Sequence, residues 1–215
     1  MLRKSSAEVI LRKSGRDDMR PAAAIAFLLL AFAAAAASAA GHRSEPAGAS
    51  HCGGPLWRLK TLSDGERGTV TLAAKTTTIQ SIGARPYPRP TPRRRRTQFQ
   101  RQVWEVVAQV TSFRLDTEGV RLILYDAGSY MNAVIPIPAC LSRRTRAREE
   151  LLSVWNRFQE GCDHANRQWQ SLGAIVYVSG VGFWSQRSKL RRGAARNAAE
   201  LHPVTGFRVV AGCRR

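Results

Sequence analysis

From residue 102 onward, short runs of apolar residues alternate with polar ones and are separated by turn residues, a pattern typical of β-strands. Five such runs are predicted to be strands: 103–115, 120–126, 131–137, 174–183 and 200–210. Pro136 indicates that the third strand lies at an edge or is about to end, because proline cannot donate a hydrogen bond to a neighbouring strand.

The first of these strands changes phase partway along its length. Alternate residues from Trp104 to Val110 share one face, whereas Phe113 and Leu115 continue the apolar pattern in the other phase. A change of this kind predicts a β-bulge in a long, strongly bent strand.

Between the third and fourth strands the apolar period becomes helical. The residues that recur at this spacing are Ala147, Leu151, Val154, Trp155 and Phe158. Ser142 or Thr145 can cap the start of this helix and Gly161 can close its end. Five strands with one helix between strands 3 and 4 predict a mainly β protein, an OB-like β-barrel. An α+β roll with the same elements is the alternative.

The N-terminus carries the pattern of a signal peptide. Residues 21–40 are uncharged, mostly apolar, follow Arg16 and Arg20, and contain the small-residue sequence Ala-Ser-Ala at 37–39. Residues 1–40 are therefore predicted to be a cleavable signal peptide, which has a more conventional length if translation starts at Met19. A retained membrane anchor is the alternative. We expect a secreted, periplasmic or cell-envelope protein.

The rest of the chain divides by composition. The predicted parts are a flexible leader (41–51), an N-terminal extension packed on the barrel (52–84), a Pro/Arg-rich linker (85–101) and the OB-like domain (102–211).

The four cysteines all follow the predicted signal peptide: Cys52, Cys140, Cys162 and Cys213. An even number in an exported protein predicts two disulfides, for which three pairings are possible. A metal site is the alternative, but no CxxC or HxxxH spacing supports it.

The chain is strongly basic, with 34 Lys+Arg against 15 Asp+Glu and a net charge of +19. Without residues 1–40 it keeps 28 basic and 12 acidic residues, a net charge of +16. Of those 28, 16 lie in three runs without an acid, at 85–101, 143–148 and 187–196. The third run falls between the last two strands, in a loop that binds ligands in OB-folds.

This clustering predicts that the chain binds a polyanion. The candidate ligand residues are Arg93, Arg94, Arg95, Arg96, Arg187, Lys189, Arg191, Arg192 and Arg196. The candidate partners are an acidic polysaccharide, an anionic lipid surface or nucleic acid, of which an exported protein meets the first two sooner. The alternative is a structural module that contacts envelope proteins. In that case the 29 Arg against five Lys reflect a GC-rich genome rather than binding.

A third hypothesis is a metal-dependent hydrolase that uses Glu200 and His202. These residues are two apart on a predicted strand, so their side chains share a face and could act as a general base or bind a metal. The structural alternative is that His202 forms a hydrogen bond to a neighbouring strand and Glu200 pairs with an arginine. The other acids, such as Asp116 and Glu118, lie at turns and are not clustered as a nuclease would need. No hydrolase or nucleotide-binding motif is present, so we expect no cofactor and assign no catalytic residue.

Four segments resemble a family of uncharacterised exported bacterial proteins. The matching segments are Gly180–Trp184 (GVGFW, against GVGFF), Glu200–Val204 (ELHPV), Cys52–Leu62 (against CG…W.VKTL) and Ile135–Cys140 (IPIPAC, against IPDPAC). The resemblance covers roughly residues 52–209. It implies that Cys52 pairs with Cys140, and therefore Cys162 with Cys213. The loop at 185–199 lacks the HGQ-like stretch of the family, so the resemblance does not extend to any function of the His in that stretch. Ile137 is a second departure, because the family tends to have Asp at this position.

Overall fold

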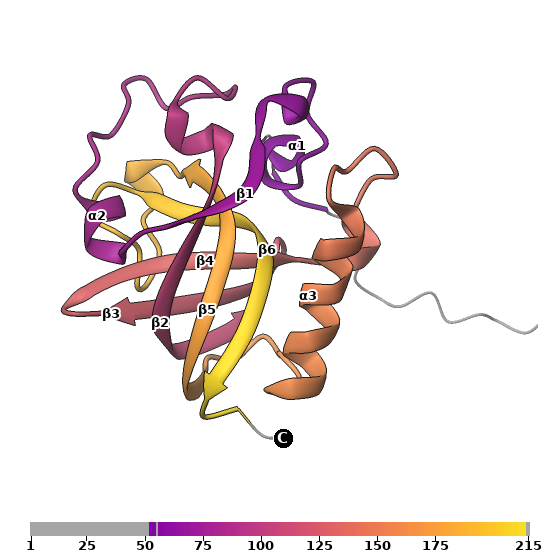
Figure 1. Ribbon diagram of the computed structural model, residues 1–215, viewed down its shortest axis with the longest axis vertical. Coiled ribbons are helices and arrows are strands. Elements are labelled where there is room, and N and C mark those ends of the chain that lie inside the picture. The colour runs from indigo at the N-terminus through magenta and orange to yellow at the C-terminus, as the bar shows by residue number, and fades with distance from the viewer. Residues whose placement is uncertain (1–51, 55, 214–215) are drawn as a thin grey trace, which may run out of the picture. The chain divides into compact units, whose positions relative to one another are not determined.

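The computed structural model describes residues 52–54 and 56–213, so the predicted signal peptide and leader lie outside the described residues. Within this part the strands are β1 (Thr71–Thr76), β2 (Gln102–Leu115), β3 (Gly119–Asp126), β4 (Ser129–Pro136), β5 (Gln170–Trp184) and β6 (Ala199–Ala211) (Figure 1). The α-helices are α1 (Trp57–Lys60), α2 (Ile79–Gly83) and α3 (Arg148–Gly161). Short 3-10 helices are η1 (Arg67–Thr69), η2 (Gln98–Arg101), η3 (Pro138–Cys140) and η4 (Arg187–Lys189).

The strands form one mixed, six-stranded sheet whose pairings close a ring. Strand β2 pairs antiparallel with β3, β3 with β4, β5 with β6, and β2 again with β5. Strands β4 and β6 complete the ring with a short parallel pairing. Strand β1 lies outside the ring, where it runs parallel to β2. The prediction of a mainly β protein with one longer helix between the third and fourth strands of the ring is confirmed.

The register of β2 shifts between Val110 and Ser112, against both β3 and β5. This is where the apolar pattern changes phase. The extra residue turns Val110 and Phe113 to the same side, and both are fully buried in the core.

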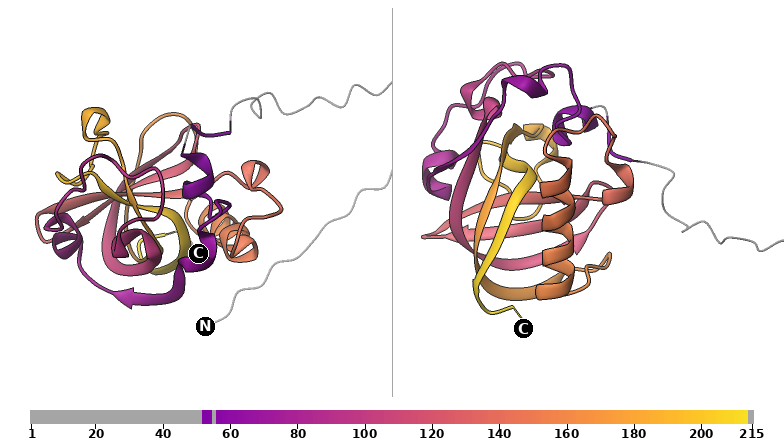
Figure 2. Two further views of the ribbon diagram at one scale, coloured as in Figure 1. Left: turned by 90° about the horizontal axis from the view of Figure 1, so that it is seen from above. Right: turned by 45° about the vertical axis from the view of Figure 1, so that its right-hand side comes forward.

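Helix α3 packs on β6 and β4 and closes one side of the core (Figure 2). Phe158 lies in this interface, with its ring centroid 5.2 Å from that of Phe113 and 5.6 Å from that of Phe207. The predicted cap is wrong. The residue before the helix is Ala147, at φ +56° and with no side-chain cap, while Ser142 instead accepts a hydrogen bond from the Arg144 backbone in the preceding turn.

Two disulfides hold the molecule together, Cys52–Cys140 and Cys162–Cys213. This is the pairing that the family resemblance implies. The first ties the start of the described chain to η3, and the second ties the end of α3 to the end of β6. Two disulfides indicate an oxidising compartment. Among residues 52–54 and 56–213, no helix is long and apolar enough to cross a membrane.

The segments that precede β2 pack against the ring. Leu62 and Val70 join Val103 and Val181 in a small apolar cluster of their own. In the predicted linker, Phe99 is buried and packs on Trp184 with its ring tilted and the ring centroids 4.8 Å apart. The Pro/Arg-rich segment is therefore fixed to the ring at its C-terminal end.

Candidate functional site

Two faces of β6 differ in chemistry. Leu201 belongs to the main core, whereas Glu200 and His202 lie on the opposite face, as expected from their spacing. Both are buried, and His202 Nδ1 lies 3.3 Å from Glu200 Oε1. The outer face of β6 therefore carries buried polar groups beneath further layers of chain.

Arg121, on β3, brings three carboxylates together. Its Nε donates to Asp116 Oδ2 at 2.8 Å, its Nη2 to Glu118 Oε2 at 2.7 Å, and its Nη1 to Glu200 Oε2 at 3.3 Å. The three acids therefore converge on an arginine, an arrangement that the turn positions of Asp116 and Glu118 did not indicate. The β2–β3 turn supplies two of them, and the parallel β4–β6 pairing brings the third to the same guanidinium.

Two further cations complete this cluster, which we call the Arg121 network. Lys60 of α1 donates to Glu118 and lies over the Phe183 ring, 5.0 Å from its centroid. Arg191 donates to Asp116 Oδ2 at 3.2 Å from the loop between β5 and β6. Three basic groups thus balance three carboxylates, which is the condition for burying charge at an acceptable cost.

The carboxylates of the network stay ionised. Burial by itself would raise the pKa of Glu200, but the hydrogen bond from His202 and the charge of Arg121 outweigh it and hold that pKa well below its usual range. The pKa of Asp116 is lowered in the same way by Arg121, against the effect of burial. The pKa of Glu118 is lowered because surrounding positive groups, Lys60 among them, outweigh burial.

His202 is neutral in this setting. Burial, together with the charge of Lys60, lowers its pKa despite the neighbouring carboxylate. Its Nδ1–H therefore donates to Glu200, and its Nε2 has no hydrogen-bond partner among the described residues. The rings of Trp57 and Phe183 pack around it, with centroids 6.3 Å and 6.0 Å away. His202 bonds to its own strand rather than to a neighbouring one.

This geometry favours a structural role for Glu200 and His202. In the described part of the chain, no three His, Cys, Asp or Glu side chains are grouped as metal ligands. Glu200 is instead paired with Arg121, as the structural alternative expects. The hydrolase hypothesis gains no support from the arrangement.

The basic loop, residues 185–198, lies over the outer face of β3 and β4. Asn132 on β4 donates to the Arg192 carbonyl at 3.2 Å. Gly193, at φ +68°, packs so closely on Ile123 that an added Cβ would lie 2.4 Å from its Cγ2. At its other end, Asn197 donates to the carbonyls of Ile82 and Arg85. The backbone of the loop is thus fixed at several points.

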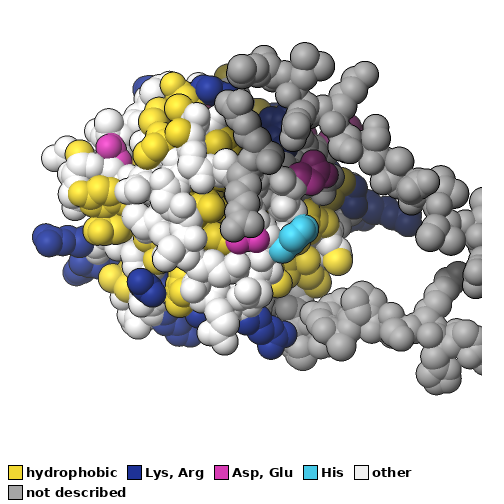
Figure 3. All heavy atoms as spheres, turned by 90° about the horizontal axis from the view of Figure 1, so that it is seen from below, with side chains coloured by type: hydrophobic (Ala, Val, Ile, Leu, Met, Phe, Trp, Pro, Cys, Tyr) yellow, Lys and Arg dark blue, Asp and Glu magenta, His cyan; other side chains and the backbone are white. Residues whose placement is uncertain are grey.

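The basic side chains of this loop all point to solvent. They are Arg187, Lys189, Arg191, Arg192 and Arg196, and each is exposed. Arg191 pairs with Asp116, and two others lie over aromatic rings: Arg187 is 5.6 Å from the Tyr87 centroid and Arg192 is 5.4 Å from that of Trp169. Figure 3 shows the molecule from below, relative to the view in Figure 1. On that face the uncovered Lys and Arg side chains lie mostly toward the rim.

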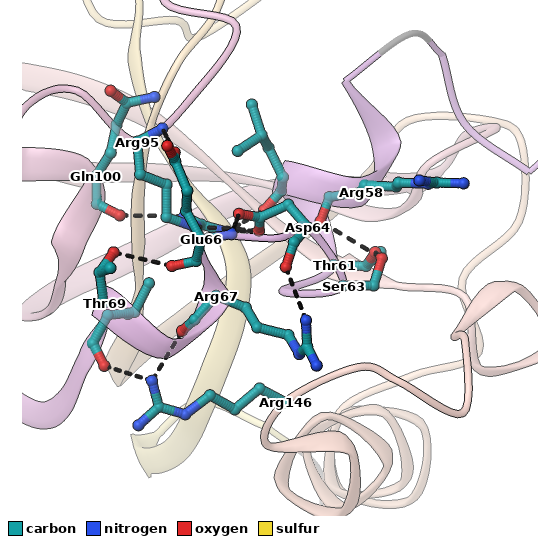
Figure 4. Close-up of polar contacts among 12 residues, drawn as sticks. Arg58, Thr61, Ser63, Asp64, Glu66, Arg67, Thr69, Arg95, Gln100 and Arg146 are labelled. Carbon is teal, nitrogen blue, oxygen red and sulfur yellow. Dashed lines mark hydrogen bonds and ion pairs between the residues drawn. The ribbon is translucent and has the colours of Figure 1, made fainter.

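The other candidate arginines belong to the segment that precedes β2. Arg95 is buried, where its guanidinium bonds Asp64 Oδ2 at 2.7 Å and the carbonyls of Leu59 and Gln100 (Figure 4). It is therefore not available to a ligand. Arg94 pairs with Glu66 at 3.0 Å. Arg93 and Arg96 are exposed, and no hydrogen bond or ion pair in the described chain joins them to the basic loop.

The sequence alone did not single out Arg121, Lys60 or Arg95 as members of buried ion networks. The only local signal is the Asp116-Thr117-Glu118 turn placed before Arg121, which puts two acids within reach of one arginine. The third acid and Lys60 come from distant parts of the chain.

Comparisons with known proteins give little further information. No protein-family model matches the chain, and no curated protein matches it at a significant level. Among solved structures, one similar chain is a putative aspartyl-tRNA synthetase from Leishmania major Friedlin, with a TM-score of 0.41 and 12% identity. The match covers 68% of this chain and 23% of that one, so this chain spans about a quarter of its length. A TM-score of this size does not establish a shared fold.

Proposed function

We propose that this protein is an exported, OB-like module that binds a polyanion through its basic loop. Its ring of strands has the element order of an OB barrel, with the helix between the third and fourth strands of the ring. The two disulfides and the apolar segment 21–40 support export. The loop between the last two strands is a ligand-binding loop in such barrels.

One observation carries the proposal: five basic side chains are exposed on a single loop whose backbone is held in place. In the described chain only Arg191 of the five forms an ion pair with an acid. A fixed backbone lowers the ordering cost of binding, and unpaired cations attract a polyanion without first breaking internal ion pairs. Arg95 has no part in this surface because its charge is already neutralised by Asp64.

The ligand class we favour is an acidic polysaccharide, because an exported protein meets such polymers outside the cell. The basic groups would act as charge contacts that do not read a sequence. An anionic lipid surface or nucleic acid would contact the same basic side chains. Binding measured with one probe of each class distinguishes these ligands from a polysaccharide.

The test measures the dissociation constant for heparin at a fixed salt concentration. In one variant Arg187, Lys189, Arg191, Arg192 and Arg196 are changed to Gln. A matched variant loses the same number of Arg and Lys at exposed positions elsewhere, namely Lys75, Arg89, Arg157, Arg167 and Arg208. We expect the loop variant to bind about tenfold more weakly or worse and the matched variant to stay within about threefold of the parent. Equal losses would show diffuse attraction and favour the structural alternative.

A further inference from the structure

Two open hollows lie on either side of Arg58, an exposed residue of α1. The first, of about 380 Å³, is lined by Arg58, Arg93 and Arg94 together with Asp64 and Glu66. The second, of about 570 Å³, is lined by Arg58 and Arg144. Arg58 thus belongs to both, and the basic side chains come from three separate segments of the chain.

The second hollow, which we call the Arg58 hollow, contains no acid in its lining. Besides the two arginines it is lined by Trp57, the hydroxyl-bearing Ser63 and Ser142, and the Cys52–Cys140 disulfide. No acidic side chain of the described residues lies within ion-pair distance of Arg58 or Arg144. Two arginines without an acidic partner in the described chain therefore line a space large enough for a small ligand.

The neighbouring acids do not cancel this charge, because each is already paired. Asp64 forms an ion pair with the buried Arg95, and Figure 4 shows both residues together with Arg58. Glu66 accepts from the Arg95 backbone N–H at 2.7 Å and pairs with Arg94. The Arg95 hydrogen bond and the arginine charges lower the pKa of Glu66, so this pairing persists at neutral pH.

The walls of the Arg58 hollow are held in place by covalent and hydrogen bonds. The disulfide joins the two sides, and the Trp57 indole N–H donates to the Cys140 carbonyl at 3.2 Å. Ser142 Oγ accepts from the Arg144 backbone N–H at 3.1 Å. A hollow built in this way exists before any ligand arrives.

We propose that the Arg58 hollow binds an acidic sugar unit, with its carboxylate or sulfate placed between Arg58 and Arg144. Guanidinium groups can form paired hydrogen bonds with two oxygens of a planar carboxylate or of a tetrahedral sulfate, and the serine hydroxyls offer hydrogen bonds to sugar hydroxyls. This site shares no residue with the basic loop, so it stands whether or not that loop binds a polymer.

The hollow is less suited to a nucleotide base. Its aromatic residue, Trp57, has one ring face against Gly53, where an added Cβ would lie 2.2 Å from the ring. The same ring packs at right angles to His202. Single-stranded nucleic acid binds through open aromatic faces on which bases stack, and this ring does not offer one in full.

The test uses short ligands that are too small to bridge to the basic loop. A heparin-derived tetrasaccharide is titrated into the full protein and into a variant with Arg58→Gln and Arg144→Gln. The matched control carries Arg167→Gln and Arg208→Gln and loses the same charge at exposed positions outside both the Arg58 hollow and the basic loop. We expect the first variant to bind the tetrasaccharide at least about tenfold more weakly and the control to bind it as the parent does.

Four outcomes would overturn this assignment. The first two are no tetrasaccharide binding to the parent and equal losses in both variants. The other two are a thymidine tetranucleotide that binds as tightly as the saccharide and loses as much affinity in the Arg58→Gln, Arg144→Gln variant, and inorganic sulfate that binds with the affinity of the saccharide. If the basic loop fails its own heparin test while the tetrasaccharide result holds, the Arg58 hollow is the binding site of the protein.

Discussion

Arginine side chains have opposite roles in two regions of this molecule. Arg121 is 1% exposed and bonds three carboxylates, whereas Arg192, on the basic loop, is exposed and bonds none in the described chain. In the first region the guanidinium is part of the framework. In the second it is available to a partner. The net charge of +19 therefore says little about binding until each arginine is placed.

The buried arginines also explain why the N-terminal segment belongs to the folded unit. In the Arg121 network, Lys60 of α1 pairs with Glu118, and Arg191 of the basic loop pairs with Asp116. Arg95 fixes the Pro/Arg-rich segment to Asp64 in a similar way. The framework arginines thus hold in place the surface that carries the exposed ones.

The largest effect should come from Arg121→Met, which keeps much of the side-chain volume and removes the charge. Asp116, Glu118 and Glu200 would then be buried together without their shared cation, so we expect a loss of about 3–5 kcal/mol in the free energy of unfolding. Urea denaturation measures this loss. The control, Arg192→Met, should change stability by no more than about 0.5 kcal/mol. Similar losses in both variants would remove the distinction between the two regions.

A neighbouring pair sharpens the same distinction within one run of arginines. Arg95→Met leaves Asp64 without its partner and should cost about 3 kcal/mol. Arg94→Met removes a largely exposed pair with Glu66 and should cost at most about 1 kcal/mol. The two unfolding midpoints in urea are compared directly. If Arg94→Met lowered the unfolding midpoint more than Arg95→Met, burial would not explain the difference between these two arginines.

The pH dependence of stability should follow the buried network. The pKa values of Asp116, Glu118 and Glu200 are lowered on folding, so their stabilisation is complete above the unfolded carboxyl pKa of about 4 and is lost as the pH falls through the lower folded values. The pKa of His202 is lowered as well. Below about pH 6.5 the unfolded chain therefore binds a proton that the folded chain resists, and stability declines.

A smaller, more specific effect is expected of His202→Gln. This change should flatten the decline in stability just below pH 6.5 while leaving the loss below pH 4 in place. His164→Gln, at an exposed histidine, is the matched control. The melting temperature from pH 8 to pH 3 gives both comparisons, and a persistent decline near pH 6 in His202→Gln would assign it to another group.

Much of the fold could be predicted because its signals are local. Alternation within each strand gave five strands, and the phase change at Val110–Phe113 marked the bulge. The shared face of Glu200 and His202 also follows from spacing alone. The helix cap was missed because Ala147 adopts a left-handed conformation, for which Ser142 and Thr145 gave no hint.

The buried network could not be predicted because its members meet only through tertiary structure. Glu200 reaches Arg121 through the parallel pairing of β4 and β6, and Lys60 comes from a helix of four residues before the ring begins. Within the run of arginines at 93–96, nothing in the sequence distinguishes the buried Arg95 from its exposed neighbours.

The most direct test of the role of the basic loop is the salt dependence of polyanion binding. A thymidine homopolymer is a suitable probe because its phosphates are evenly spaced, so the slope of log K against log salt counts the contacts. With five groups neutralised to Gln in the loop, we expect this slope to fall in magnitude by up to about 3.5, at about 0.7 per lost contact, and by less than about 1 in the matched variant. A slope that is unchanged in the loop variant, or that falls equally in both variants, would contradict a binding site on this loop.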